Sequence, residues 1–537
     1  PYSYQVPSSR FPRVIELRAT ADAEAPAREL TRRAVADTIP IGGVVEGPRS
    51  HLWHPNRDAT LLWVEALDGG DPGAEVAHRD RLLGLEAGQP TASARALHDL
   101  EHRFSSLQAP YNTSFAFVSE YDRDRRWTRT WSLALSFRDP STPLAEAPRL
   151  VFDRSVNDHY GNPGRFLTFM NPRGQSSVVG DGGTVWLNAP GGGPEGDRPQ
   201  LRQMQLGTGE MVERWRSAPQ TYETPMALLP GERVLTRFES KTVAPHYRVR
   251  SLAGDDMVML TEPVNPAPEL DGVSKELITY ERDDGVPLSA TLYLPPGHQP
   301  GQRHPLLVWA YPREYNDLST AGQVRGSEHR FTRLRGPSHL YMLLEGWAVL
   351  DGAAMPVIGD PETMNETFVE QIVAAAGAAI DAVDARGVID RDRVAVGGHS
   401  YGAFMTANLL AHSDLFRAGI ARSGAYNRSL TPFGFQSERR TLWEATDTYV
   451  RVSPFFQADQ IDEPLLMVHG EKDNNSGTFP IQSERLFHAL RGHGGTARLV
   501  MLPHESHGYR ARESVLHVLA EQAEWLERHA GPRDVQP

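Results

Sequence analysis

Short apolar runs separated by turn-forming residues fill most of the first half of the chain. Their alternation of apolar and polar positions, bounded by Gly, Pro and Asp, is typical of β-strands. The clearest runs lie at residues 61–67, 114–121, 131–137, 183–188 and 233–238. Helical periodicity is scarce between them, which predicts an all-β domain of the propeller type.

The second half of the chain alternates continuous apolar runs with helical patterns. The apolar runs lie at residues 305–310, 347–350, 394–396, 464–470 and 498–503, and the helical patterns lie at 366–386 and 514–529. Strands that are buried on both faces give continuous apolar runs. We therefore predict a doubly wound, mostly parallel α/β sheet. In the last helix, the apolar positions Val515, Leu516 and Val518 are expected in the core.

A Gly-x-Ser-x-Gly sequence directly follows the apolar run at 394–396. It reads Gly398-His399-Ser400-Tyr401-Gly402, and a helix is predicted from about Phe404. A serine on such a sharp strand-to-helix turn presents its hydroxyl above the sheet, and the glycines avoid a collision in the bend. The pattern therefore indicates Ser400 as a candidate nucleophile, with an ordinary turn as the alternative.

Two later strands also end at candidate catalytic groups. Asp473 follows the run at 464–470, and His504 and His507 follow the run at 498–503. The order Ser, Asp, His along the chain is that of α/β-hydrolases, whose sites lie at the carboxyl ends of strands. A serine hydroxyl needs an imidazole as base, and the imidazole needs a carboxylate to hold it. From the residues alone, both histidines stay open as the base, and Asp473 could instead cap a helix.

The two histidines also raise the possibility of a metal site. His504-Glu505-Ser506-His507 is one residue shorter than the His-Glu-x-x-His zinc spacing, and it lies in a predicted loop. We therefore expect neither a metal nor another cofactor.

Composition narrows the classes of function. The net charge of −13 and the lack of a basic run argue against a nucleic-acid partner. No apolar run is long enough to span a membrane, so we expect a soluble protein without a membrane partner. The chain has no cysteine and therefore no disulfide. Because lysine occurs only at 241, 275 and 472, any carboxylate-binding pocket is expected to use arginine.

The start of the chain gives a further expectation. The first residue is Pro1, so we expect that the native start and any targeting signal precede it. The compartment is therefore open, with the cytoplasm or periplasm of a bacterium as the expectation. The oligomeric state is also open.

Several long motifs resemble a known family. The sequences at 397–402, 469–475 and 505–509 are similar to the catalytic domain of the prolyl oligopeptidase family of serine peptidases. Those at 397–408, 419–428, 430–436 and 440–446 resemble its glutamyl endopeptidase branch, known from chloroplasts and bacteria. The resemblance is close over about residues 270–530. It implies an α/β-hydrolase domain at 266–537 behind a β-propeller at 1–265.

The resemblance assigns catalytic roles to matching positions. Ser400 would be the nucleophile, Asp473 the orienting acid and His507, rather than His504, the base. The backbone N–H of Tyr401 and the hydroxyl of Tyr311 would hold the oxyanion.

The resemblance also implies a substrate-binding residue and an expected size for the propeller. In relatives the residue matching Asn475 holds the substrate backbone. The family's propellers have seven or eight blades of roughly 40–50 residues each, which is more than about 265 residues supply. Either the first blades lie outside this chain, where an amino-terminal fragment of the same precursor could supply them, or the propeller is small.

The expected activity is that of a serine endopeptidase that cleaves peptides or unfolded proteins after acidic residues, glutamate above all. The arginines that could bind the acidic side chain are Arg422, Arg428, Arg439 and Arg440, and Arg428 matches a primary-pocket aromatic of dipeptidyl-peptidase relatives. The alternatives are an acylaminoacyl or dipeptidyl exopeptidase of the same family, a small-molecule esterase and a non-catalytic scaffold.

Overall fold

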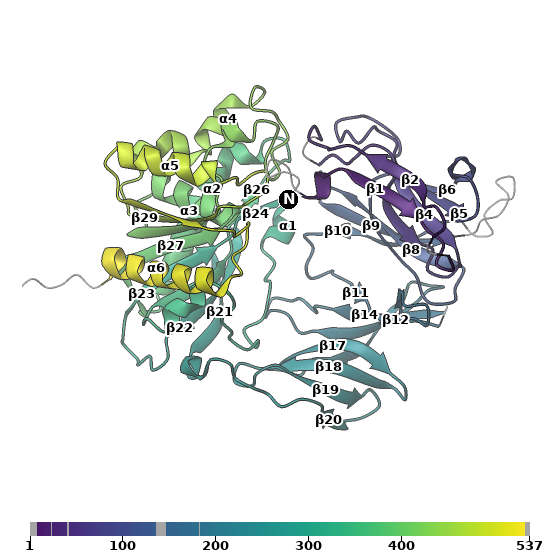
Figure 1. Cartoon of the computed structure of the whole chain (residues 1–537). Coiled ribbons are helices and arrows are strands. Elements are labelled where there is room, and N and C mark those ends of the chain that lie inside the picture. The colour runs from purple at the N-terminus through teal and green to yellow at the C-terminus, as the bar shows by residue number, and fades with distance from the viewer. Residues whose placement is uncertain (1–7, 23, 40–41, 136–146, 182, 532–537) are drawn as a thin grey trace, which may run out of the picture.

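The computed structural model describes residues 8–22, 24–39, 42–135, 147–181 and 183–531. Figure 1 shows an all-β region, which runs from the purple amino-terminal strands to the teal β20, beside a region of helices packed on a sheet. In the described residues no helix is both long and apolar enough to cross a membrane.

The all-β region is a series of small antiparallel sheets that follow one another in an arc (Figure 1). Within the described residues it contains four sheets of four strands, in the orders β3-β4-β5-β6, β10-β9-β8-β7, β11-β14-β15-β16 and β17-β18-β19-β20. The strands are β1 (Arg13–Leu17), β2 (Arg28–Arg33), β3 (Arg49–Trp53), β4 (Thr60–Ala66), β5 (Asp80–Glu86), β6 (Arg95–Leu100), β7 (Arg103–Gln108), β8 (Phe115–Asp122), β9 (Trp127–Ala134), β10 (Arg149–Ser155), β11 (Arg165–Phe166), β12 (Thr168–Met170), β13 (Ser176–Val178), β14 (Thr184–Ala189), β15 (Gln200–Gln205), β16 (Met211–Arg216), β17 (Tyr222–Leu229), β18 (Arg233–Glu239), β19 (His246–Ser251) and β20 (Met257–Met259). Four-stranded sheets of this kind are the blades of a propeller, as predicted.

The predicted strands correspond to β4, β8, β9, β14 and β18, although the end of the run at 131–137 lies outside the described residues. The separate pair β1–β2 packs through Leu30 against Leu61 and Trp63 of the first blade. Aromatic and aliphatic side chains from adjacent blades fill the space between them, as where Phe117 of β8 stacks on Phe166 of β11 with ring centroids 4.3 Å apart.

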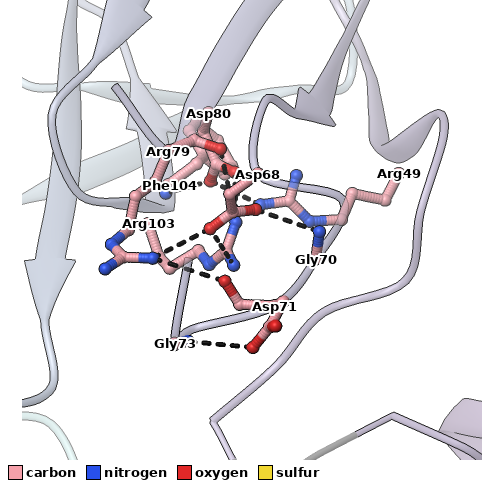
Figure 2. A network of polar contacts seen from close by, with 9 residues as sticks. All are labelled: Arg49, Asp68, Gly70, Asp71, Gly73, Arg79, Asp80, Arg103 and Phe104. Atoms are coloured by element: carbon pink, nitrogen blue, oxygen red, sulfur yellow. Dashed lines mark hydrogen bonds and ion pairs between the residues drawn. The ribbon is translucent and has the colours of Figure 1, made fainter. Parts of the chain in front are cut away.

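A buried ionic network joins the first two blades (Figure 2). Arg103, at the start of β7, donates to Asp68 Oδ2 at 2.7 Å and to Asp80 Oδ1 at 3.1 Å, and both aspartates belong to the preceding blade. Arg49 and the backbone N–H of Phe104 also donate to Asp80, whose side chain has no exposed surface. Each carboxylate is therefore satisfied by groups from two blades, so the network fixes their relative position.

The second region contains a single eight-stranded sheet in the order β21-β22-β25-β23-β27-β28-β29-β30. Its strands are β21 (Ser274–Glu281), β22 (Pro287–Leu294), β23 (His304–Ala310), β25 (Ala348–Ala353), β27 (Ile389–His399), β28 (Ala418–Arg422), β29 (Leu465–Gly470) and β30 (Ala497–Leu502), beside a small pair, β24 (Arg313–Tyr315) with β26 (Pro356–Ile358). The first three strands pair antiparallel and the others parallel. This is the predicted, mostly parallel α/β-hydrolase sheet.

Helices cover both faces of this sheet (Figure 1). They are α1 (Leu318–Ala321), α2 (Phe368–Asp384), α3 (Tyr401–His412), α4 (Thr446–Arg451), α5 (Ile481–Gly492) and α6 (Arg512–Ala530), with short 3₁₀ turns η1 (Ser8–Arg10), η2 (Thr91–Ser93), η3 (Pro268–Leu270), η4 (His339–Leu343), η5 (Met364–Thr367), η6 (Arg428–Leu430) and η7 (Pro454–Gln460). α2 and α3 pack on one face, and α6 packs on the other. One core prediction is wrong: Leu516 of α6 is 55% exposed, because the buried face of that helix runs through Val518, Trp525 and Leu526.

The order of the strands determines where a site can form. The chain passes from β23 to β25 on one side and then to β27 on the other side. At such a switch point the connections diverge and leave a crevice at the carboxyl ends of the strands. Tyr311 follows β23 and Ser400 follows the adjacent β27. The boundary between the two regions near residue 265 stays a prediction.

We expect Asp80→Ala to lower the free energy of unfolding by about 3–5 kcal/mol, because it leaves Arg49 without its buried counter-charge and removes one of the two carboxylates that pair with Arg103. The matched control is Asp99→Ala, which breaks the partly exposed ion pair with Arg81 and should cost at most about 1 kcal/mol. Urea denaturation followed by tryptophan fluorescence measures both. Equal losses in the two variants would show that the network does not hold the blades together.

Candidate active site

Ser400 lies at a strained turn between β27 and α3. Its backbone is left-handed, with φ of 60° and ψ of −117°. A side chain at Gly398 would meet the backbone of Gly402 at 2.4 Å, and one at Gly402 would meet the Ala310 carbonyl at 2.5 Å. Both glycines are therefore required for strand and helix to approach so closely. The result is the serine turn of an α/β-hydrolase.

The acid and one histidine are in contact. Asp473 Oδ2 lies 2.8 Å from His507 Nδ1, and the Thr478 hydroxyl contacts both groups at 3.1–3.2 Å. His504 is exposed on the same loop, so the structure pairs Asp473 with His507. Among the described residues no hydrogen bond joins His507 to the Ser400 hydroxyl. Such contacts are often long in a site without substrate.

Asp473 is held in its charged form. Burial alone would raise the pKa of this carboxyl, but hydrogen bonds from His469, His507 and the Asn475 N–H lower the pKa to about 2. His469 is itself buried, and its Nε2 lies 3.2 Å from Asp473 Oδ2 and 2.7 Å from the Thr478 carbonyl. Sequence reasoning missed His469, although its place one residue before the end of β29 points it towards the same loop.

His399 precedes the nucleophile and lies against the candidate base. Its ring centroid is 4.9 Å from that of His507. Burial, followed by the charges of Arg422 and His507, lowers the pKa of His399 to about 3. A neutral ring at this position adds no positive charge beside His507. In the part of the chain that the structure describes, no group of three or more metal-ligating side chains gathers here or elsewhere.

Two groups could stabilise an oxyanion above Ser400. Tyr401 is the first residue of α3, so its backbone N–H has no partner within the helix. Tyr311 lies beside it, with the two rings in edge-to-face contact at 5.9 Å between centroids. Partial burial, followed by the charge of Glu314, raises the pKa of Tyr311, while a hydrogen bond with Ser400 acts in the opposite direction. The structure thus brings both predicted donors to the nucleophile.

A cavity of about 1340 Å³ opens above the serine, between the sheet of the hydrolase and the propeller. It is called the interdomain cavity below. Ser400, Tyr401, Arg428 and Asn475 line it from the hydrolase, and residues of the first two blades and of the segment before them line the other wall. The cavity therefore brings together the candidate nucleophile, one candidate oxyanion donor and two of the residues predicted to bind substrate.

Arg428 is the one predicted arginine that the structure places in this cavity. The side chain is 3% exposed and lies between the rings of Phe404 and Phe435, with its Cζ atom 4.1 and 4.5 Å from their centroids. Its Nε has no hydrogen-bond partner, and among the described residues no carboxylate forms an ion pair with it. Burial lowers the pKa of Arg428 to about 10, so it is charged at neutral pH.

The other three predicted arginines lie elsewhere. Arg422 is buried beneath the sheet, where it donates to Gln522 Oε1 at 3.2 Å and stacks on Trp309. Arg439 pairs with Asp124 of the propeller and with Glu362. Arg440 pairs with Glu438 at 2.9 Å and with Glu366 at 2.7 Å. Each of them already has partners and none lines the interdomain cavity.

Sequence reasoning also missed Glu314, a buried carboxylate on β24. Its Oε1 accepts the Tyr401 hydroxyl at 3.1 Å, and its Oε2 accepts the Ser437 hydroxyl at 2.7 Å. Oε2 also pairs at 2.9 Å with Arg126, which lies on the β8–β9 turn of the propeller. Glu314 therefore connects the propeller to the residue that follows the nucleophile. No local motif marks it, because its partners come from three distant segments.

The strand order, the serine turn and the acid–histidine pair together define an α/β-hydrolase with a propeller-like partner domain. Residues 364–533 match the model described as "Prolyl oligopeptidase family". This part of the chain therefore matches a family of serine peptidases.

Comparison with known proteins gives long matches. The chain is 46% identical over 553 residues to a protein named "Probable glutamyl endopeptidase, chloroplastic" from Oryza sativa subsp. japonica, covering 98% of this chain and 58% of the relative. The Arabidopsis thaliana protein of the same name is 43% identical, with 99% and 57% covered. The chain thus spans little more than half the length of these relatives. A solved structure described as a putative dipeptidyl aminopeptidase IV from Bacteroides ovatus shares the fold, with a TM-score of 0.62 and 15% identity over 94% of this chain and 80% of that one.

We expect Ser400→Ala, Asp473→Asn and His507→Ala each to lower peptidase kcat by roughly a thousandfold or more, since each removes a part of the proton-transfer chain. His504→Ala is the matched control, because His504 is an exposed histidine on the same loop. Hydrolysis of a fluorogenic peptide and labelling by a fluorophosphonate measure the effects. A large loss in His504→Ala with a mild one in His507→Ala would overturn the assignment of the base.

Tyr311→Phe should raise the barrier by about 2–4 kcal/mol, mainly through kcat, because it removes one oxyanion donor and leaves the ring in place. Steady-state kinetics on the same peptide measures it, and circular dichroism controls for folding. An unchanged kcat would exclude Tyr311 from the mechanism.

Proposed function

We propose that this protein is a serine endopeptidase that cleaves peptides or unfolded protein segments after glutamate. The observation that carries the specificity is Arg428, a buried guanidinium without a carboxylate partner beside the candidate nucleophile. A charge left unpaired in a buried site costs free energy unless a ligand compensates it. A glutamate side chain of the substrate would supply that compensation, through hydrogen bonds that a guanidinium can make in pairs. The names of the two plant relatives agree with this proposal.

In the proposed mechanism, the Ser400 hydroxyl attacks the backbone carbonyl carbon of the glutamate residue. His507 takes the hydroxyl proton and passes it to the leaving amine, while Asp473 holds the imidazole. The Tyr401 N–H and the Tyr311 hydroxyl stabilise the oxyanion. Water then attacks the acyl-enzyme, with His507 taking the proton of the water and giving a proton back to Ser400. Asn475, at the exposed rim of the cavity, would hold the substrate backbone.

The exopeptidase and esterase alternatives are not favoured by the comparisons. A longer precursor whose amino-terminal part completes the propeller is compatible with the greater length of the relatives and stays a prediction.

Arg428→Ala should lower kcat/KM for a Glu peptide, by an amount equivalent to roughly 2–4 kcal/mol of transition-state stabilisation. The value for the matched Gln peptide should change little, because only the charged side chain loses its partner. Arg428→Lys should recover part of the loss, since an ammonium cannot form the paired hydrogen bonds. The measurement is kcat/KM on two fluorogenic peptides that differ only before the scissile bond.

Arg439→Ala serves as the control for this prediction, because Arg439 is a neighbouring arginine outside the cavity. It should leave the ratio of Glu to Gln cleavage near the wild-type value. If Arg428→Ala slows both peptides equally, Arg428 has a structural role and the proposed specificity is wrong.

A further inference from the structure

The propeller wall of the interdomain cavity carries positive charge that the proposed function does not use. Arg10, Arg33 and Arg123 all line the cavity from the propeller side. Arg33 donates to the backbone carbonyls of Ser9 and Phe11, and Arg123 donates to that of Gln436. Among the described residues none of the three forms an ion pair with a carboxylate. Their charges therefore remain available to a ligand.

The cavity as a whole has the opposite charge from the rest of the protein. Its lining contains five arginines, Arg10, Arg33, Arg123, Arg126 and Arg428, and three acidic residues, Asp37, Glu46 and Asp71. The full chain has a net charge of −13. Arg126 is already paired with Glu314, but the lining still has more positive than negative groups. A concave site whose walls carry an excess of one sign of charge attracts ligands of the other sign. The cavity thus favours acidic peptides even though the protein surface repels them.

Arg123 is connected to the candidate specificity pocket around Arg428 through one loop of the hydrolase. It is on the β8–β9 turn and donates to the carbonyl of Gln436 on the hydrolase. The preceding residue, Phe435, packs against the guanidinium of Arg428. Arg123 of the propeller and Arg428 of the hydrolase therefore contact adjacent residues of the same loop. Both arginines line the interdomain cavity.

The surroundings of Arg123 disfavour its own charge. Burial, followed by the charges of Arg126 and Arg439, lowers the pKa of Arg123. A bound carboxylate would relieve this repulsion, and it would meet a guanidinium that is already positioned by its contact with Gln436.

We propose that Arg123 binds a second carboxylate of the substrate, so that the enzyme prefers peptides with two negative charges near the scissile bond. This inference rests on the proposed function, with Arg428 binding the first carboxylate. The second carboxylate comes either from a neighbouring Asp or Glu side chain or from the free carboxyl terminus of a short peptide. Both sources present the same group to the guanidinium.

The test uses internally quenched peptides with one Glu, blocked termini and otherwise neutral residues. A second Glu, with Gln as its matched control, is moved one position at a time on both sides of the scissile bond. A further pair of peptides differs only in a free or amidated carboxyl terminus. The quantity measured is the ratio of kcat/KM between each charged peptide and its neutral match, with the cleavage position checked by mass spectrometry.

For the wild-type protein we expect one position, or the free carboxyl terminus, to raise this ratio by roughly tenfold, the size of a charge-assisted hydrogen bond in a partly buried site. In Arg123→Gln the ratio should fall to about one, and Arg123→Lys should keep part of it. Arg125→Gln is the matched control, because Arg125 is exposed on the same turn and does not line the cavity. It should keep the wild-type ratio. Added salt should lower the wild-type ratio.

The outcomes separate this inference from the function on which it rests. If no second carboxylate raises the ratio, or if Arg123→Gln keeps the full gain, the proposal for Arg123 is wrong. If the wild-type protein cleaves peptides with Gln before the scissile bond as well as those with Glu, the proposed function is wrong. The Arg123-dependent ratio is then still measured on the same peptides. Dependence on the internal Glu or on the free terminus identifies the source of the carboxylate.

Discussion

One buried carboxylate links the two domains to the catalytic turn. Glu314 accepts hydrogen bonds from the Tyr401 hydroxyl and from Ser437, and it pairs with Arg126 of the propeller. In a site of low dielectric each of these interactions is strong, and losing Arg126 would leave the buried charge of Glu314 without its ion pair. The propeller therefore contributes to the position of the catalytic turn as well as covering the site. The position of its β8–β9 turn and the position of Tyr401, whose N–H faces the reacting carbonyl in the proposed mechanism, depend on the same group.

Glu314 also explains why Arg428 remains available. Burial lowers the pKa of Arg428 and the charge of Glu314 acts in the opposite direction, yet the oxygens of Glu314 are already occupied by Arg126, Tyr401 and Ser437. The carboxylate of Glu314 and the guanidinium of Arg428 therefore do not form an ion pair with each other. Aromatic rings on both sides of Arg428 exclude water and supply cation–π attraction, which stabilises the charge without satisfying its hydrogen bonds. In the proposed function, a substrate carboxylate supplies the missing partner.

Much of the fold and the core of the site followed from local patterns. The Gly-x-Ser-x-Gly turn is visible in sequence because steric limits act within a few residues of Ser400. The strand ends at Asp473 and His507 are visible because buried parallel strands are continuously apolar. The choice among arginines could not be made in this way. Arg422, Arg428 and Arg439 differ in what lies across from them, and those partners come from residues up to several hundred positions away.

The same limit accounts for the residues that sequence reasoning missed. Leu516 and Val518 are two residues apart and so lie on opposite sides of the helix, and only the packing against the sheet decides that the side of Leu516 is exposed, at 55%. His469 reads as the end of an apolar strand, and its contact with Asp473 depends on the loop that returns Thr478 to the same carboxylate. Charge is informative in a sequence only when its compensation is known. The groups that compensate a charge come from distant parts of the chain. An arginine without an ion pair among the described residues, such as Arg428 or Arg123, can therefore be recognised only from the folded structure.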